Sequence, residues 1–310
     1  MQNYNALHMY NKERYGGKVF KAVIDGGFTC PNIDGSKGTG GCIFCDGGSG
    51  YFTHGGSVEQ QLEREIIRIK DKHSNAKVIA YFQANTNTYA PVDVLKERFE
   101  AAIRRPEVIG LAIGTRADCL SDGVLEYLVE LSRKTDLTVE LGLQTVHDET
   151  LRLINRRYTH EEFLDGYNRL KSAGIRICLH IINGLPYETL EMMIETARQA
   201  GIMRPDAVKI QMLHVIRGTA LHEQLYGKFR ILELNEYIET VVRQLEYFSP
   251  ETVIERITGD GDKSKLVAPL WSADKIAVLG GIDKAQRNLN SRQGMRFSEG
   301  VFDENNNSRL

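Results

Sequence analysis

Three of the chain's five cysteines lie within sixteen positions, at Cys30, Cys42 and Cys45. An odd number of crowded cysteines is a poor disulfide framework and a better set of metal ligands in a reducing compartment. Three thiolates can hold a four-iron, four-sulfur ([4Fe-4S]) cluster with one iron left without a protein ligand. That iron can accept the amino and carboxylate groups of S-adenosylmethionine (SAM), so the cysteine count indicates cofactor chemistry.

The segment that carries these cysteines is unusually rich in glycine. Eleven of the chain's 29 glycines lie between Gly26 and Gly56. Glycine lets the backbone take turns with positive φ and approach a bulky inorganic group closely. A folded loop can also offer N–H donors to cluster sulfurs. The composition of the loop therefore favours an enclosed inorganic group.

Two other interpretations of the cysteines remain open on spacing alone. A zinc site completed by a histidine such as His54 would use a similar spacing, and would predict a non-catalytic nucleic-acid-binding module. Cysteine is also a common small core residue without any ligand role. We interpret Cys119 and Cys178 in this last way, since one follows an expected strand and the other lies inside one.

Strands and helices that alternate along the chain are expected to position the cysteine loop. Short runs of Val, Ile and Leu alternate with amphipathic stretches, which predicts six strand-helix units around a parallel sheet. The expected strands are Lys18–Val23, Lys77–Tyr81, Val108–Ile113, Thr138–Leu143, Arg176–Ile182 and Ala207–Leu213. The expected helices are Ser57–Lys72, Pro91–Arg104, Asp122–Lys134, Glu161–Ala173, Leu190–Ala200 and Thr219–Leu225, with Ser57 and Gln60 capping the first. Functional loops of such sheets follow the carboxyl ends of the strands.

The alternation ends near residue 227. A helix near Glu233–Phe248, a short strand near Thr252–Ile257 and a mainly helical segment from Asp274 follow. We therefore expect a strand-helix domain over residues 1–226, with its N-terminal arm, and an extension over residues 227–310 packed on it. The last residues, Asp303–Leu310, are polar and are expected to fray.

Composition is that of a folded protein in water. Of the 310 residues, 42% are hydrophobic and 26% are charged, which suits a packed core. The net charge of −2 gives no global attraction to nucleic acid or to an anionic membrane, so either partner would need a local patch. No apolar run reaches the length of a membrane span or a signal peptide, so we expect a cytoplasmic protein without a membrane partner.

Cys30, Cys42 and Cys45 resemble the motif of the radical SAM superfamily. The surrounding residues resemble the branch that contains YhcC- and YtqA-type proteins and the radical SAM part of the elongator catalytic subunit. The usual motif has three residues between its first two cysteines, whereas this chain has eleven, a spacing typical of this branch. The resemblance extends from about Asn5 to Asp260 through the segments Gly114–Leu120, Glu140–Gln144, Asn183–Pro186 and Gly218–Leu221. It implies an α/β fold, a partial (β/α)6 barrel of the TIM type with a mainly helical C-terminal extension.

The same resemblance implies cofactor-binding residues. Phe44 resembles the aromatic residue near the adenine of SAM, and Gln144 the residue that hydrogen-bonds the ribose. Arg156 resembles the arginine that grips the SAM carboxylate, with its neighbour Arg157 as the alternative. The family's glycine-rich second-strand motif is replaced here by Phe82–Thr88, whose backbone carbonyls could still accept from the SAM ammonium. The remaining implied cofactor contacts are Ala84, Asn85, Thr115, Ile182 and Gly184.

The resemblance also implies a reaction. An external one-electron donor of the flavodoxin or ferredoxin type reduces the cluster, SAM is cleaved, and a 5′-deoxyadenosyl radical abstracts hydrogen from an enclosed substrate. Four residues are expected to act on that substrate or line its cavity, namely Arg116, His180, Gln211 and His214. A core role for His180 is equally compatible with its position.

The substrate implied by the elongator side of the family is the wobble uridine of bacterial transfer RNA (tRNA), modified at its 5-substituent. Basic residues near both ends could hold RNA phosphates, namely Lys12, Arg14, Lys18 and Lys21, and Lys275, Lys284, Arg287, Arg292 and Arg296. An alternative is a small metabolite such as a tetrapyrrole, which would need the same cluster and no RNA.

Overall fold

The computed structural model describes residues 3–46, 55–83, 85–259 and 261–297. The chain forms two compact units, each built from separate stretches of sequence. We call residues 8–142 and 155–178 the cysteine-loop unit, and residues 1–7, 143–154 and 179–310 the C-terminal unit.

All six predicted strands are present, and a seventh joins them. The strands of the main sheet are β1 (Val19–Ile24), β2 (Lys77–Phe82), β3 (Val108–Thr115), β4 (Asp136–Gln144), β5 (Arg176–Asn183), β6 (Ala207–Met212) and β8 (Val253–Arg256). Hydrogen-bonded neighbours follow that order. The pairs β1–β2, β2–β3, β3–β4 and β6–β8 are parallel. The short strand expected in the extension is therefore part of the sheet.

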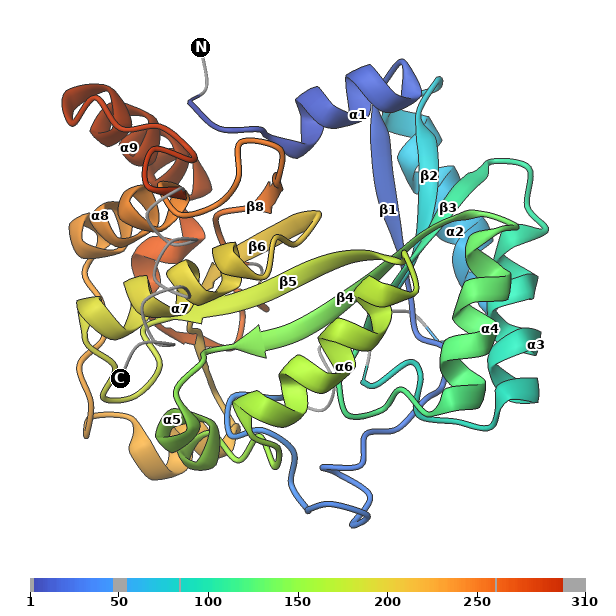
Figure 1. Cartoon of the computed structure of the whole chain (residues 1–310), viewed down its shortest axis with the longest axis horizontal. Coiled ribbons are helices and arrows are strands. Elements are labelled where there is room, and N and C mark those ends of the chain that lie inside the picture. Colours follow the sequence, from blue (N-terminus) through green and yellow to red (C-terminus); the bar gives the residue numbers. More distant parts are fainter. Residues whose placement is uncertain (1–2, 47–54, 84, 260, 298–310) are drawn as a thin grey trace, which may run out of the picture. The chain divides into compact units, whose positions relative to one another are not determined.

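In the cysteine-loop unit, helices alternate with the strands along the chain, and the first two of these helices pack against β1 and β3 (Figure 1). The helices are α2 (Val58–Lys72), α3 (Val92–Ile103), α4 (Asp122–Ser132) and α6 (His160–Ser172), and α1 (Leu7–Tyr15) precedes the first strand. The predicted capping box of α2 is confirmed, because Ser57 accepts from the Gln60 N–H and Gln60 returns a bond to the Ser57 N–H. This exchange satisfies two backbone donors that the helix itself leaves unpaired.

An aromatic cluster fills the core of this unit. Phe99 is fully buried on α3, with its ring centroid 4.9 Å from that of Phe82 and 6.0 Å from that of Phe28. Tyr127 on α4 stacks on Phe99, with 6.4 Å between the ring centroids. Phe28 lies two residues before Cys30, so the core anchors the start of the cysteine loop.

The C-terminal unit holds the rest of the chain's elements. They are α5 (Asp148–Leu153), α7 (Leu190–Ile202), a π-helical turn (Leu221–Leu225), α8 (Leu234–Leu245), a 3-10 turn (Leu270–Ala273) and α9 (Lys275–Asn288), with β7 (Val215–Ile216) and β9 (Leu266–Ala268) as an antiparallel pair. The sixth predicted helix is thus only a five-residue turn. Tyr237 of α8 is fully buried and donates to the carbonyl of Ile257, which fixes α8 against the end of β8.

Candidate cluster and cofactor site

The cysteine loop folds back on itself. The carbonyl of Cys30 accepts from the N–H groups of Ile33 and Asp34, and the N–H of Gly41 donates to the carbonyl of Asn32 over 2.8 Å. A further turn joins Cys45 to Cys42, with the N–H of Cys45 donating over 2.9 Å. These bonds place the segment after Cys30 beside the segment before Cys42. None of the five cysteines is in a disulfide.

Glycine makes this fold possible in the way the sequence indicates. Gly35, Gly40 and Gly41 all have positive φ, at 94°, 79° and 72°. A Cβ on Gly38 would lie 2.5 Å from Oδ1 of Asn32, which is a clash with a fully buried side chain. The loop therefore needs glycine both for its turns and for its packing.

The Cys42 sulfur lies in a buried polar environment. Asn32 Nδ2 approaches Sγ at 3.8 Å and Arg156 Nη1 at 3.7 Å. Arg156 Nη2 donates to the carbonyl of Gly142 at 2.8 Å and to the Tyr158 hydroxyl at 2.6 Å. Burial acts to lower the pKa of Arg156, but Tyr158 and Cys42 outweigh it, so the net pKa is raised and the guanidinium stays charged.

A second network connects the cysteine loop to the end of β3. Asp118 accepts from both Nε and Nη2 of Arg116 at 2.9 Å, and from Lys37 of the loop at 2.6 Å. Burial acts to raise the pKa of Asp118, but these two cations outweigh it and lower the net value. Arg116 Nη1 donates to the carbonyl of Arg156, so both networks converge on one segment.

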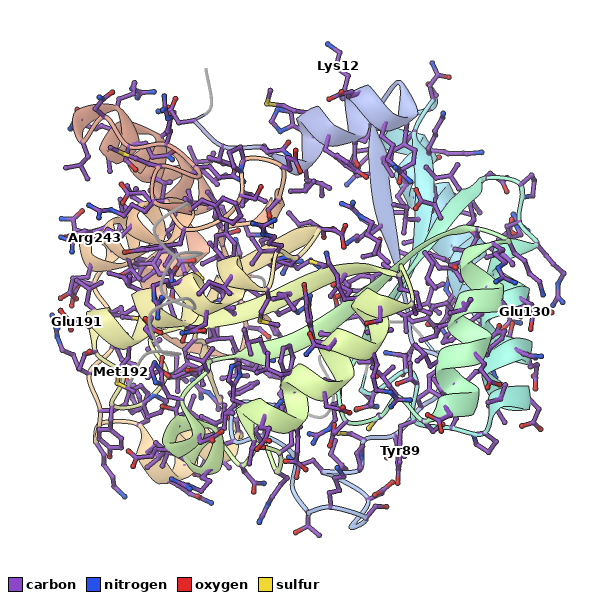
Figure 2. The ribbon with its side chains drawn as sticks, viewed as in Figure 1. Lys12, Tyr89, Glu130, Glu191, Met192 and Arg243 are labelled. Atoms are coloured by element: carbon purple, nitrogen blue, oxygen red, sulfur yellow. The ribbon has the colours of Figure 1, made fainter. Side chains whose placement is uncertain are left out.

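Further contacts hold the loop from its other side. Tyr89, which is labelled in Figure 2, follows β2 and donates to the hydroxyl of Ser36 at 2.7 Å. Asn155 donates to the carbonyl of Gly41 at 2.7 Å and has a positive φ of 57°, a conformation that asparagine tolerates better than most residues. Asn32, Lys37, Asp118, Asn155 and Tyr158 were all missed at the sequence level. Asp118 alone carried a signal, because it lies inside a motif of the resemblance.

The remaining predicted residues of this unit lie around the loop. Phe44 is half-buried, Asn85 donates to the carbonyl of Phe28 at 2.8 Å, and Thr115 bonds Thr88 at 2.6 Å. Ala84 lies outside the described residues, as does His54, the histidine of the zinc alternative. Arg116 bonds Asp118 and the carbonyl of Arg156, which are contacts that stabilise the fold, and a catalytic role for Arg116 stays a prediction.

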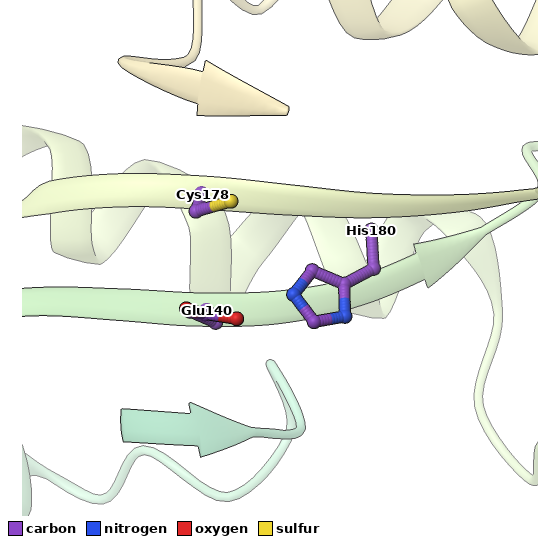
Figure 3. A group of neighbouring side chains, drawn as sticks. All are labelled: Glu140, Cys178 and His180. Atoms are coloured by element: carbon purple, nitrogen blue, oxygen red, sulfur yellow. The ribbon is translucent and has the colours of Figure 1, made fainter. Parts of the chain in front are cut away.

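Cys119 and Cys178 have surroundings that suit core residues. Cys178 is fully buried on β5, and burial together with Asp118 raises the pKa of the Cys119 thiol to about 12. Glu140 lies on β4 near Cys178 and His180 (Figure 3). It accepts from Lys21 at 2.6 Å and from Tyr81 at 2.8 Å. His180 is two residues after Cys178 on the same strand and so projects from the same face.

In the C-terminal unit, the predicted residues follow the strand ends. Gln144 ends β4 with a positive φ of 67°, and its buried Oε1 has no partner among the described residues. Gly184, after β5, has a φ of 82°, and the half-buried Ile182 precedes it by two. Gln211 accepts from Arg256 of β8 at 3.4 Å.

His214 follows β6 and lies in a cradle made by two glycines. A Cβ on Gly259 would lie 2.5 Å from Cε1 of the ring, and a Cβ on Gly261 would lie 2.6 Å from Nδ1. Both glycines follow β8, so the extension supplies the surroundings of a residue that the sequence assigned to β6. The pairing of β8 with β6 brings these glycines to His214.

Comparison with known proteins identifies the family. Residues 34–200 match the radical SAM superfamily, and residues 205–288 match the radical SAM C-terminal domain. The chain is 45% identical to YtqA of Bacillus subtilis over 302 residues, covering 96% of this chain and 93% of that protein. This chain belongs to the radical SAM superfamily. As a radical SAM enzyme it uses a [4Fe-4S] cluster and SAM and requires a reductant, so the predicted class of enzyme and its cofactors are confirmed.

Two other similarities concern the elongator branch. This chain is 31% identical to a tRNA uridine(34) acetyltransferase of Methanocaldococcus infernus over 137 residues, which cover 43% of this chain and 25% of that protein. The solved structure of Elp3 from the same archaeon, lacking its N-terminus, has a TM-score of 0.67 at 20% identity and covers 89% of this chain and 64% of that one. This likeness confirms the α/β partial-barrel fold. No described helix is long and apolar enough to cross a membrane.

Proposed function

We propose that this radical SAM enzyme acts in tRNA modification, with Cys30, Cys42 and Cys45 as the cluster ligands and the wobble uridine as substrate. The observation that carries the substrate is the 31% identity to the tRNA uridine(34) acetyltransferase. The aligned part covers a quarter of that protein, so the proposal includes no acetyl transfer.

The residues of the cysteine loop fit an iron-sulfur cluster. Three thiols come from one short segment, and Cys42 is approached by two N–H groups, as the sulfur ligands of such clusters commonly are. The loop is held to the rest of its unit by Asn155, Lys37 and Tyr89. A cluster ligated here would therefore be bound to a fixed scaffold.

The other proposed cofactor contacts have polar groups to offer. When bound, the reduced cluster and SAM together supply a radical that abstracts hydrogen from the substrate. Gln144 presents a buried amide oxygen without a partner among the described residues, which suits a hydroxyl of a ribose. Arg156 Nε is likewise buried with no partner in the described part of the chain, and it can donate to a carboxylate.

The basic residues proposed to hold RNA phosphates are only partly available. Arg14 and Lys21 pair with Asp136 and Glu140. Arg287 pairs with Asp283, and Arg296 with Glu246. Exposed Lys12 and Lys18 of the first group, and Lys284 and Arg292 of the second, remain the better candidates for phosphate contacts (Figure 2 labels Lys12).

A reconstitution experiment tests the ligands. Protein purified without air and supplied with iron and sulfide should bind about four irons per chain, and after reduction with SAM should release 5′-deoxyadenosine. Cys30→Ala, Cys42→Ala and Cys45→Ala should each lose both properties, and Cys178→Ala should keep them. A colourless wild-type protein that holds one zinc would refute the assignment.

A nucleoside comparison tests the substrate. Transfer RNA from cells with the gene, without it, and with the Cys42→Ala allele should differ at the wobble uridine, with the last two alike. A nucleoside profile that is identical in all three strains would exclude this substrate and leave a small metabolite as the target of the same chemistry.

A further inference from the structure

The protein environment of Cys42 is more elaborate than cluster ligation alone requires. Cys42 is 8% exposed, and its sulfur faces two donors on Asn32 and Arg156, residues that are 0% and 7% exposed. The N–H···S distances are 3.8 and 3.7 Å. One donor is a neutral amide and the other is a cation, so both the dipole and the charge favour negative charge on this sulfur.

Both donors are fixed by further partners. Asn32 Nδ2 also donates to the carbonyl of Asn155. Arg156 Nη2 is held by the carbonyl of Gly142 and by the Tyr158 hydroxyl, and that hydroxyl donates in turn to Gly142 at 2.7 Å. The Arg156 guanidinium also lies over the Tyr158 ring, 4.6 Å from its centroid. The donors therefore keep their direction without depending on bound SAM.

The charge on the cluster changes when it accepts an electron. Hydrogen bonds to its sulfurs and nearby positive charge stabilise the reduced form and raise the reduction potential. Such effects are larger in a buried, weakly polarisable environment than in water. We propose that Asn32 and Arg156 set the reduction potential of the cluster through Cys42, so that Arg156 is a positioning and tuning residue in addition to any contact with SAM.

This inference rests on the proposed role of Cys42 as an iron ligand. It differs from the role that the family resemblance implies for Arg156, which is to grip the SAM carboxylate. Nη1 and Nη2 contact protein atoms, whereas Nε is the nitrogen left for a carboxylate. A measurement made without SAM therefore isolates the effect on the cluster.

The test is a redox titration of reconstituted protein in the absence of SAM, followed by the EPR signal of the reduced cluster. Arg156→Met removes the charge and the Nη1 donor to the sulfur at similar volume, and should make reduction at least tenfold less favourable, a potential about 59 mV more negative for one electron. Arg156→Lys keeps the charge and loses the planar fork, so its reduction potential should lie between those of the wild type and Arg156→Met. Asn32→Asp replaces the donor by an acceptor of the same shape and should also lower the potential.

Arg157→Met is the matched control, because this exposed neighbour has the same charge and the same side chain. It should titrate like the wild type. Iron content is measured for every variant. If Arg156→Met takes up less iron than the wild type, the reduction potentials of Arg156→Lys and Asn32→Asp test the inference instead.

Variants that carry a full cluster and titrate at the wild-type potential would overturn the inference and leave the proposed ligands intact. By contrast, a Cys42→Ala variant with an unchanged cluster would overturn the ligand assignment itself. Shifts in Arg156→Met and Asn32→Asp, with none in Arg157→Met, would support the tuning role.

Discussion

Asp118→Asn should release the cysteine loop from the end of β3. The carboxylate of Asp118 accepts three charged N–H bonds, two from Arg116 and one from Lys37. The side chains of Asp118 and Arg116 are only 6% and 3% exposed, whereas Lys37 is 38% exposed. The substitution would therefore leave the Arg116 cation buried without its counter-ion.

The cost follows from that burial. Removing one partner of a buried ion pair costs about 3 to 5 kcal/mol, because the remaining charge is not resolvated. The bond to Lys37 adds little, since exposed pairs contribute roughly 0 to 1 kcal/mol. With a urea dependence of about 3 kcal/mol per molar, the unfolding midpoint should fall by about 1 to 2 M.

The assay is urea unfolding of the cluster-free protein, followed by fluorescence and by hydrogen exchange of the loop. Glu130→Gln is the control. Glu130, labelled in Figure 2, lies on α4 and pairs with the exposed Lys134, so its substitution should change stability by at most about 1 kcal/mol. Exchange in residues 30–46 should accelerate in Asp118→Asn only. A midpoint equal to that of Glu130→Gln, with unchanged exchange, would show that the network does not hold the loop.

Three further outcomes are expected. Gly166→Ala should destabilise the protein by roughly 1 to 3 kcal/mol in thermal unfolding, because the added Cβ would lie 2.2 Å from the carbonyl of Ala117, whereas Gly174→Ala, with open space, tests the effect of positive φ alone. Burial raises the pKa of Glu188, so its folded pKa exceeds the unfolded one and stability falls as pH rises from the unfolded pKa to the folded pKa. As pH rises above the ordinary glutamate pKa of about 4.3, Glu188→Gln should therefore gain stability relative to the wild type, and a difference that stays constant with pH would contradict this. Gly259→Ala should displace the His214 ring and reduce product formation by up to about a hundredfold at unchanged iron content, if His214 contacts the substrate.

Local sequence accounts for much of the fold. The capping box at Ser57 and Gln60 and the six strands depend on residues close together in the chain, and these were predicted. The helix α1 was missed because it has no apolar stripe, with Asn11 as its buried residue. The sixth predicted helix, Thr219–Leu225, is only a π-helical turn over Leu221–Leu225. Weak periodicity over short segments explains both errors.

For the candidate site, the sequence alone determined the ligand types and their grouping. Three thiols and eleven glycines in one loop are properties of composition and spacing, and they fix the chemistry that the loop can support.

Only the tertiary structure decided which groups surround those thiols. Arg156 lies 114 residues after Cys42 in the chain, yet its guanidinium reaches the Cys42 sulfur. Likewise β8 pairs with β6, although the partners Ala207 and Val253 are 46 positions apart. A buried charge needs a partner and a strand edge needs a neighbouring strand, and the fold supplies both from segments far apart in the chain. No periodicity along the chain records such contacts.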